Sequence, residues 1–348
     1  LEILVLEQKG LSTGGHLDHV VPALLKDYRV NYLKTTDLEE ARQAIQRADL
    51  IWLEWASQLT AAVTRKVPEL QSKPVICRLH GFEVFTSLPR QINWTVVDKL
   101  IFVANHKRDL FHQRFPKVDV DQAVIRNGVN LDQFSIPEKK QNTKNLLLLG
   151  HINYRKGLTL LLQFYHELLK RDPDFDLYIR GDWQDPRYKM AIMTMVKELG
   201  LEKKVTFVEE WIDDLNAWLA DKSHILSFSL EESFHYAIGN GMAAGMKPVI
   251  HAWNESREIW PARFIFRDLD EFLGLITEDS YDPTVYRKLL IDHRLTANHQ
   301  LQEITGLLSD LSANIEPSAW NSFTGRPGDL SRRARTNIPT TGKNVPLL

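Results

Sequence analysis

The chain has 348 residues, which is more than one hydrophobic core usually holds, so two domains are expected. A hydrophobic content of 43% and a charged content of 25% are typical of a globular protein, and a net charge of −2 excludes a global attraction to nucleic acid. The single cysteine, Cys77, excludes an internal disulfide, and no group of His and Cys residues has zinc-site spacing, so no metal is expected. No run of about 18 apolar residues occurs, so we expect neither a membrane-spanning helix nor a signal peptide, and we predict a cytoplasmic protein.

The first half of the chain alternates between apolar runs and helical patterns. Strands are expected at residues 3–6, 28–33, 49–55, 73–80, 99–104 and 123–125, and helices at 38–47, 57–67 and 105–115. A glycine loop at 12–15 follows the first strand and precedes apolar residues at helical spacing. This alternation predicts a mostly parallel sheet with helices on both faces.

The second half repeats this plan after a polar segment that has no hydrophobic period. Strands are expected at 145–149, 175–179, 205–208, 225–228, 248–253 and 263–266, and helices at 157–170, 189–199, 215–220 and, for the most part, 282–311. Asp282 is a candidate helix cap, and Pro283 suits a first helical position. The chain beyond 313 becomes rich in Pro, Gly, Arg and Thr, and we expect it to be partly disordered.

These patterns predict the α/β class, with two doubly wound Rossmann-like domains that face each other across a cleft. The expected boundaries are residues 1–136 for the first domain, 137–144 for a linker, 145–312 for the second domain and 313–348 for a C-terminal segment. Ligands bind at the carboxyl ends of parallel strands, so the cleft is the expected site.

The turn after the strand at 225–228 is the most informative stretch. It precedes a short helix rich in Ala and Gly, where free backbone N–H groups and the helix dipole favour an anion. The carboxylate of Glu232 is not needed for an anion, so its place indicates contact with hydroxyls or with a developing positive charge. A solvated loop carboxylate is the alternative for Glu232, and we expect the adjacent Glu231 to point away as a solvated charge.

Five separate motifs occur in the order and spacing of one family. They are Thr13–His16, His80–Gly81, the crossover at 125–130 with Phe134, the turn at 150–157, and the stretch 229–245. The set spans residues 1 to about 310 and resembles the retaining glycosyltransferases of GT-B fold in the family-four group (glycosyl transferases group 1).

The resemblance implies transfer of a sugar from a UDP- or GDP-linked donor to an acceptor hydroxyl, with retention of anomeric configuration. No cofactor or metal would be needed, and the acceptor would be a glycan or a lipid-linked molecule. Two other functions stay open. One is a non-catalytic GT-B-fold protein that binds a partner or glycan. The other is a nucleotide-sugar epimerase, although the cluster of carboxylates and histidines that elimination needs is not seen.

The resemblance also assigns roles to the glycine loop and to the basic turn. Gly14 and Gly15 would let the backbone approach the donor's phosphates, with a simple tight turn as the alternative. Lys156 and Arg155 stand at a helix start, where cations do not help the dipole, and would neutralise the departing pyrophosphate. A solvated basic turn is the alternative for this pair.

Three residues are predicted to be catalytic: His80, Lys156 and Glu232. By resemblance, His80 would contact a sugar hydroxyl or the acceptor, and Glu232 would orient hydroxyls of the donor sugar. A histidine held by the fold is the alternative for His80.

The chain departs from the family's pattern at four positions. His151 stands where the family has Arg, and Asn240 replaces the second glutamate of a pair separated by seven residues. Ser233 and His235 replace glycines on either side of Phe234. An amide carries no charge, so weaker ribose binding is expected at Asn240, and the larger side chains beside Phe234 would narrow the donor pocket.

Five further residues are weaker candidates. Glu258 matches a late acidic position near the donor, and Trp211 lies where the family holds the nucleotide base, with packing as its alternative. Lys107, Arg108 and Arg114 share one predicted helix and could face an anionic membrane surface at the inner face of a membrane. A solvated helix face is favoured for these three.

Overall fold

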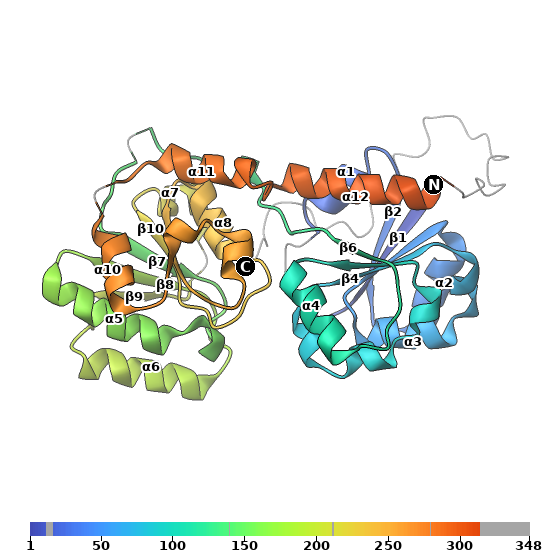
Figure 1. The fold of residues 1–348 in the computed structure, drawn as a ribbon, viewed down its shortest axis with the longest axis horizontal. Helices are drawn as coiled ribbons and strands as arrows, with labels where there is room; N and C mark the ends of the chain where they lie inside the picture. Colours follow the sequence, from blue (N-terminus) through green and yellow to red (C-terminus); the bar gives the residue numbers. More distant parts are fainter. Residues whose placement is uncertain (12–16, 139, 211, 279, 314–348) are drawn as a thin grey trace. The chain divides into compact units, whose positions relative to one another are not determined.

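The structure is a computed structural model that describes residues 1–11, 17–138, 140–210, 212–278 and 280–313. Within these residues the strands form two parallel six-stranded sheets (Figure 1), which confirms the predicted α/β class with two doubly wound halves. Gly14, Gly15, Trp211 and the predicted disordered segment beyond 313 lie outside the described residues.

The first sheet has the strand order β2-β1-β3-β4-β5-β6. Its strands are β1 (Glu2–Gln8), β2 (Arg29–Thr35), β3 (Leu50–Glu54), β4 (Val75–Leu79), β5 (Lys99–Phe102) and β6 (Gln122–Val124). The helices of this half are α1 (Val20–Leu24), α2 (Leu38–Arg47), α3 (Gln58–Lys66) and α4 (Asn105–Arg114), with short 3-10 helices between them. Every residue of β3 and β4 is buried, as expected for strands covered on both faces.

The second sheet has the order β12-β11-β10-β7-β8-β9. Its strands are β7 (Asn145–Leu149), β8 (Asp176–Arg180), β9 (Val205–Val208), β10 (His224–Ser227), β11 (Lys247–His251) and β12 (Ile265–Phe266). The helices of this half are α5 (Leu158–Arg171), α6 (Pro186–Glu198), α7 (Leu215–Leu219), α8 (Tyr236–Ala243), α9 (Ser256–Ile259), α10 (Leu269–Thr277), α11 (Pro283–Asp292) and α12 (Ala297–Ser312).

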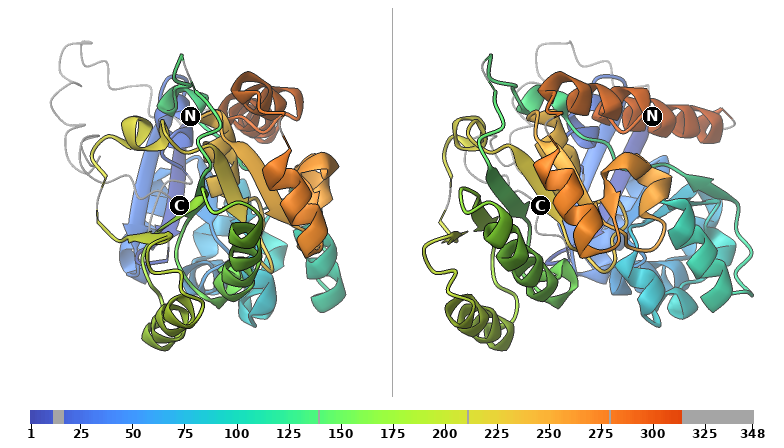
Figure 2. Two further views of the ribbon diagram at one scale, coloured as in Figure 1. Left: turned by 90° about the vertical axis from the view of Figure 1, so that its left-hand side faces the viewer. Right: turned by 60° about the vertical axis from the view of Figure 1, so that its left-hand side comes forward.

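Strand β7 contributes alternate side chains to two hydrophobic cores. Leu147 and Leu149 pack in the core that α8 and α11 share, whereas Leu146 and Leu148 pack in the core that α5 and α6 share. Each fully buried Leu contributes about 1.5–3 kcal/mol to folding, so the alternation fixes the register of the strand. Helices therefore cover both faces of this sheet (Figure 2).

Two helices, rather than one, form the segment at 282–311. Asp282 accepts hydrogen bonds from the N–H groups of Thr284 and Val285, and Pro283 occupies the first turn, as predicted. Helix α11 ends near Arg294, whose backbone is left-handed with φ of 58°, and α12 then begins. The sequence pattern did not predict α10, which begins at the cap Asp268.

Contacts divide the chain into two compact units, each described here by itself. Among the described residues, the first unit holds 1–101, 114–123 and 303–313, and the second holds 102–113 and 124–302. All of α4 except Arg114 thus belongs to the second unit, although the preceding strand β5 pairs in the first sheet. The predicted domain boundaries stay a prediction. None of the described helices has the length and apolar character that crossing a membrane requires.

Candidate active site

Two turns meet at the carboxyl ends of the neighbouring strands β7 and β10. The Leu230 N–H donates to the Arg155 carbonyl oxygen at 2.8 Å, which ties the turn after β10 to the turn after β7. Gly157 has a φ of 67°, and a Cβ at this position would lie 2.1 Å from the Phe228 carbonyl oxygen. Only glycine permits both this backbone conformation and this close approach.

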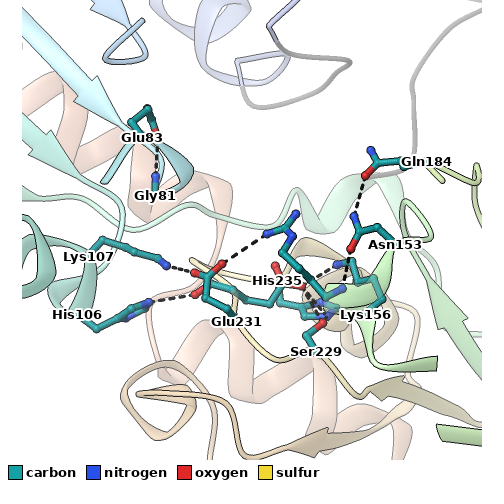
Figure 3. Close-up of polar contacts among 12 residues, drawn as sticks. Gly81, Glu83, His106, Lys107, Asn153, Lys156, Gln184, Ser229, Glu231 and His235 are labelled. Atoms are coloured by element: carbon teal, nitrogen blue, oxygen red, sulfur yellow. Dashed lines mark hydrogen bonds and ion pairs between the residues drawn. The ribbon is translucent and has the colours of Figure 1, made fainter. Parts of the chain in front are cut away.

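The turn after β7 is held from its other side by an amide. Asn153 accepts a hydrogen bond from the Arg155 N–H at 3.0 Å and donates its amide N–H to Gln184 Oε1 at 2.7 Å (Figure 3). The backbone that carries Arg155 and Lys156 is therefore fixed before any ligand binds.

Two consecutive cations face two consecutive carboxylates across the two turns. Lys156 Nζ lies 2.7 Å from Glu232 Oε1, and Arg155 Nη1 lies 3.4 Å from Glu231 Oε2. We call these two contacts the ion-pair ladder. The Lys156 side chain passes Gly150, where an added Cβ would lie 3.5 Å from Nζ, an ordinary contact distance, while the φ of 133° at this position favours glycine.

The carboxylate of Glu232 is engaged through one oxygen. Oε1 accepts from Lys156 Nζ at 2.7 Å and from Ser229 Oγ at 2.8 Å, and it lies 3.4 Å from His235 Nε2. Oε2 makes no hydrogen bond or ion pair with the described residues. Burial raises the pKa of Glu232, but the Lys156 ammonium and the hydrogen bonds from Lys156 and Ser229 outweigh burial and lower the pKa to about 2. Glu232 is therefore ionised, with one oxygen open.

His235 lies behind this carboxylate. Its Nε2 is 3.2 Å from Ser229 Oγ, and its side chain is only 2% exposed (Figure 3). Burial lowers the pKa of His235 to about 4, so the ring is neutral near pH 7. The ring faces Ser229 and Glu232, and the predicted narrowing of a donor pocket by His235 stays a prediction.

A buried lysine on α4 corrects two expectations. Lys107 is 1% exposed and forms an ion pair with Glu231 (Figure 3). Glu231 is therefore held between Lys107 and Arg155, and the prediction of a solvated charge is wrong. Lys107 cannot belong to an exposed, membrane-facing helix surface, since a buried ammonium must stay with its partner. Arg108 is partly exposed and paired with Asp109.

Glu258 anchors the start of α4. Its Oε1 accepts from the Asn105 N–H, the Asn105 amide and Arg126 at 3.1, 2.7 and 3.0 Å, and its Oε2 accepts from the His106 N–H at 3.2 Å. Both oxygens are thus used by the protein. Glu258 has this structural role, and its predicted donor contact stays a prediction. The sequence could not show this role, because α4 lies about 150 residues earlier in the chain.

The remaining donor candidates of the second unit differ in their surroundings. Phe234 is buried in the hydrophobic core, so its side chain cannot meet a ligand without repacking. Ser233 and Asn240 are half-buried, and the Asn240 amide makes no hydrogen bond with the described residues. His151 lies 3.9 Å from Asp182, and burial, aided by the Lys156 ammonium, lowers its pKa, so it adds little positive charge near pH 7.

His80 follows β4 in the first unit. Its Nε2 lies 2.7 Å from Glu54 Oε1, and its ring stacks on Trp55 with centroids 3.8 Å apart. Burial, with Arg78 nearby, holds the pKa of His80 well below its usual value. The Gly81 N–H donates to Glu83 at 2.7 Å (Figure 3). The fold thus holds the ring firmly, and its predicted catalytic role stays a prediction.

Ser229 and His106 contact the site although the sequence pattern predicted no role for them, and Lys107 contacts it in a role other than the predicted one. Ser229 could have been found, because it lies three residues before Glu232 and directly after a strand. The sequence gives no signal that His106 and Lys107 contact this site, because their contacts join segments over 120 residues apart. For example, His106 Nε2 lies 3.0 Å from the Glu232 carbonyl oxygen.

The chain is similar to known glycosyltransferases in sequence and in fold. Residues 143–272 match the family model described as Glycosyl transferases group 1. HepE of Anabaena, solved with UDP and glucose, superposes with a TM-score of 0.73 over 89% of this chain and all of that one, at 16% identity. A glycosyltransferase from Rickettsia africae gives 0.68 over 90% of this chain and 99% of that one, also at 16% identity. The fold is GT-B.

The relatives found by sequence match a smaller share of this chain than the solved structures do. A GDP-mannose:cellobiosyl-diphosphopolyprenol alpha-mannosyltransferase of Xanthomonas oryzae is 24% identical over 60% of this chain and 57% of its own length. An uncharacterized glycosyltransferase of Haemophilus influenzae is 22% identical over 66% of this chain and 62% of its own length. The chain thus matches less than two thirds of the length of these relatives.

Proposed function

We propose that this protein is a glycosyltransferase that moves a sugar from a nucleotide-sugar to an acceptor hydroxyl, with retention of anomeric configuration. One observation carries the proposal. Glu232 is an ionised carboxylate with Oε1 fixed by Lys156 and Ser229, and its Oε2 has no hydrogen bond with the described residues, which leaves it able to accept one from a ligand hydroxyl. An ionised carboxylate can accept hydrogen bonds but cannot protonate a leaving group, so Glu232 orients the sugar.

The charges of the ion-pair ladder, together with Lys107, favour a diphosphate beside that hydroxyl site. Lys107, Arg155 and Lys156 are three cations, whereas Glu231 and Glu232 are two carboxylates, which leaves one positive charge in excess. The excess charge attracts an anion and stabilises the negative charge that develops on a leaving diphosphate. These side chains can supply that charge, which supports metal-independent transfer as part of the proposal.

The bond changes balance without a further reactant. The bond between the anomeric carbon and the diphosphate oxygen breaks, and the acceptor oxygen bonds to the same face of that carbon. The acceptor's proton leaves with the diphosphate. Lys156 and Arg155 stabilise the departing charge, and positioning supplies much of the remaining rate.

The donor is proposed to carry uridine or guanosine diphosphate. HepE has been solved with UDP-glucose, and the Xanthomonas relative is named for GDP-mannose. That relative is also named for a diphosphopolyprenol acceptor, which supports a lipid-linked or glycan acceptor here. The open Asn240 amide is proposed to bind the ribose hydroxyls.

Calorimetry with UDP, GDP and their common sugar conjugates tests the proposal, followed by donor hydrolysis or transfer assays. Lys156→Met should weaken diphosphate binding and lower turnover at least tenfold, because an ammonium near the diphosphate is lost. Lys170→Met is a matched control on the exposed face of α5, where the lysine pairs only with Glu167, and should bind as the wild type does. Absence of binding to every UDP and GDP ligand would overturn the enzymatic function.

A non-catalytic binding protein is the second candidate. The neutral Asn240 and the neutral His151 favour it, because both replace charged residues of the family. Nucleotide binding without hydrolysis or transfer for any acceptor fraction would support this alternative.

A further inference from the structure

The backbone of His235 has a conformation that suits glycine. Its φ of 70° and ψ of 70° are left-handed, and it precedes the first residue of α8. A residue with a Cβ costs about 1 kcal/mol or more in this region, where glycine costs little. A histidine here is expected to provide a contact that glycine cannot.

The hydrogen bonds around its ring have one consistent direction. Ser229 Oγ lies 2.8 Å from Glu232 Oε1, and an ionised carboxylate only accepts, so the serine hydroxyl donates to Glu232. The Ser229 oxygen can then accept from His235 Nε2 at 3.2 Å, which requires a proton on Nε2. Nδ1 is left without a proton, and it is buried without a hydrogen-bond partner among the described residues.

We propose that His235 is a positioning residue, which acts through Ser229 to fix Oε1 of Glu232 and so keeps Oε2 open for a hydroxyl of the donor sugar. The proposal rests on the proposed function, because it assigns the sugar to Oε2. The groups that face the ring are Ser229 and Glu232, with Lys156 on the far side of the carboxylate. A carboxylate held by donors on one oxygen cannot rotate to offer the other oxygen to Lys156, so its orientation is set before the ligand binds.

Two other roles for the ring predict different results. A ring that contacts the diphosphate would need exposure, but the side chain is 2% exposed and Nδ1 is buried. A ring that only fills space would need no hydrogen bond to Ser229.

His235→Gly separates these roles, since glycine adopts the same backbone without strain and only the ring is removed. We expect the kcat for donor hydrolysis or transfer to fall about ten- to a hundredfold, because a catalytic group is misplaced. The Kd for UDP or GDP alone should stay within about threefold of the wild type, because Glu232 acts on the sugar and not on the nucleotide. A parallel loss of nucleotide affinity, or unchanged kcat and Kd, would overturn the proposal.

Glu255→Gly is the matched control. Glu255 is exposed and also left-handed, with a φ of 60°, so this variant makes the same backbone change away from Glu232. It should leave kcat and Kd unchanged. If His235→Gly does not fold, His235→Asn takes its place, because asparagine tolerates left-handed backbone and is too short to reach Ser229 as the ring does.

Nitrogen-15 NMR of the ligand-free protein tests the link without any assay of function. The His235 ring should show a protonated Nε2 and an unprotonated Nδ1 near pH 7, and Ser229→Ala should abolish this single tautomer. The opposite tautomer, or an even mixture in the wild type, would overturn the proposal. A wild type that binds no UDP or GDP ligand would overturn the proposed function instead, and the NMR result would still decide the link from His235 to Glu232.

Discussion

Glu232 combines two properties that rarely occur in one partly buried carboxylate. It is ionised, because Lys156 and Ser229 offset the cost of burial, and one of its oxygens remains unused. A carboxylate that only stabilised the fold would be expected to use both oxygens, as Glu258 does. The comparison of these two glutamates, within the same unit, supports the proposed ligand contact of Glu232.

Glu232→Gln should remove most of the transfer activity while the fold persists. The amide keeps the shape but replaces one acceptor with a donor, so the expected loss of kcat is about a hundredfold. Steady-state kinetics with the donor found by calorimetry measures this loss. Glu231→Gln is the matched control at the neighbouring position and should lose far less, since its carboxylate pairs with Lys107 and Arg155. An equal loss in both variants would contradict the assignment of Oε2 to the sugar.

The same carboxylate predicts a pH dependence of stability. The pKa of Glu232 is lowered from 4.5 to about 2, so its stabilising contribution is present above about pH 4.5 and is lost as the pH falls toward 2. The difference in unfolding free energy between the wild type and Glu232→Gln should shrink by roughly 3 kcal/mol over that range. Urea unfolding at several pH values measures it, and a constant difference from pH 5 to pH 2.5 would contradict the ion pair with Lys156.

At the scale of elements, the site depends on how closely the turns after β7 and β10 approach. Gly157 permits this approach, and the hydrogen bond from the Leu230 N–H to the Arg155 carbonyl oxygen fixes it. Helix α4 adds a third element, because Lys107 and His106 contact Glu231 and the Glu232 backbone. The site is therefore built from three segments and not from one motif.

Gly157→Ala should destabilise the protein by at least about 2 kcal/mol, because it combines left-handed strain with a clash against backbone. Gly200→Ala is a matched control. Its φ of 68° is nearly the same, but a Cβ there would meet nothing within 4 Å. Gly200→Ala should lower the free energy of unfolding by only about 1 kcal/mol, because only the left-handed backbone strain applies there. Thermal and urea unfolding measure both, and equal losses would show that the close approach of the turns is not needed.

Glu258→Ala should release the start of α4. The N–H groups of Asn105 and His106 and the Arg126 guanidinium would lose their acceptor, at a cost of about 2–3 kcal/mol. Glu255→Gln, at an exposed neighbouring position, should stay within about 0.5 kcal/mol of the wild type. Urea or thermal unfolding of both variants measures these losses. A severe loss of nucleotide affinity at unchanged stability would restore the donor contact that the sequence predicted for Glu258.

For the whole molecule, binding of a nucleotide should raise the free energy of unfolding. A nucleotide that binds only the folded state adds about 2.7 kcal/mol at a concentration of one hundred times its Kd. Hydrogen exchange should slow in the segments 150–157 and 229–240, which carry the ion-pair ladder and Asn240. Exchange at the 3-10 helices of the first unit should change little when no acceptor is present. Uniform protection of both units by the nucleotide alone would contradict a donor site confined to the second unit.

The sequence predicted much of the fold because local patterns determine it. The strand at 145–149 and the helix at 38–47 were predicted with the bounds that the structure has, since apolar runs and the cap Asp37 define them locally. The break near Arg294 was missed, because a left-handed arginine has no sequence signature.

The candidate site was predicted only in part, for a related reason. The residues of the two turns, such as Lys156 and Glu232, lie within short motifs directly after strands. The roles of Glu258, Lys107 and Glu231 depend on contacts across more than 120 residues, which no local pattern encodes. Burial also determines the protonation state of His235, and burial at this position cannot be read from the sequence.

The path of the chain through α4 bears on how hybrid proteins could be built. Residues 102–113 lie before the predicted linker at 137–144 but belong to the second unit, where Glu258 and Glu231 hold them. A chimera joined at that linker would bring foreign residues to positions 105–107. The carboxylates of Glu258 and Glu231 would then lose the partners that they have in this chain. Recombination that exchanges the first half for new acceptor specificity would need to keep Asn105, His106 and Lys107 from this chain.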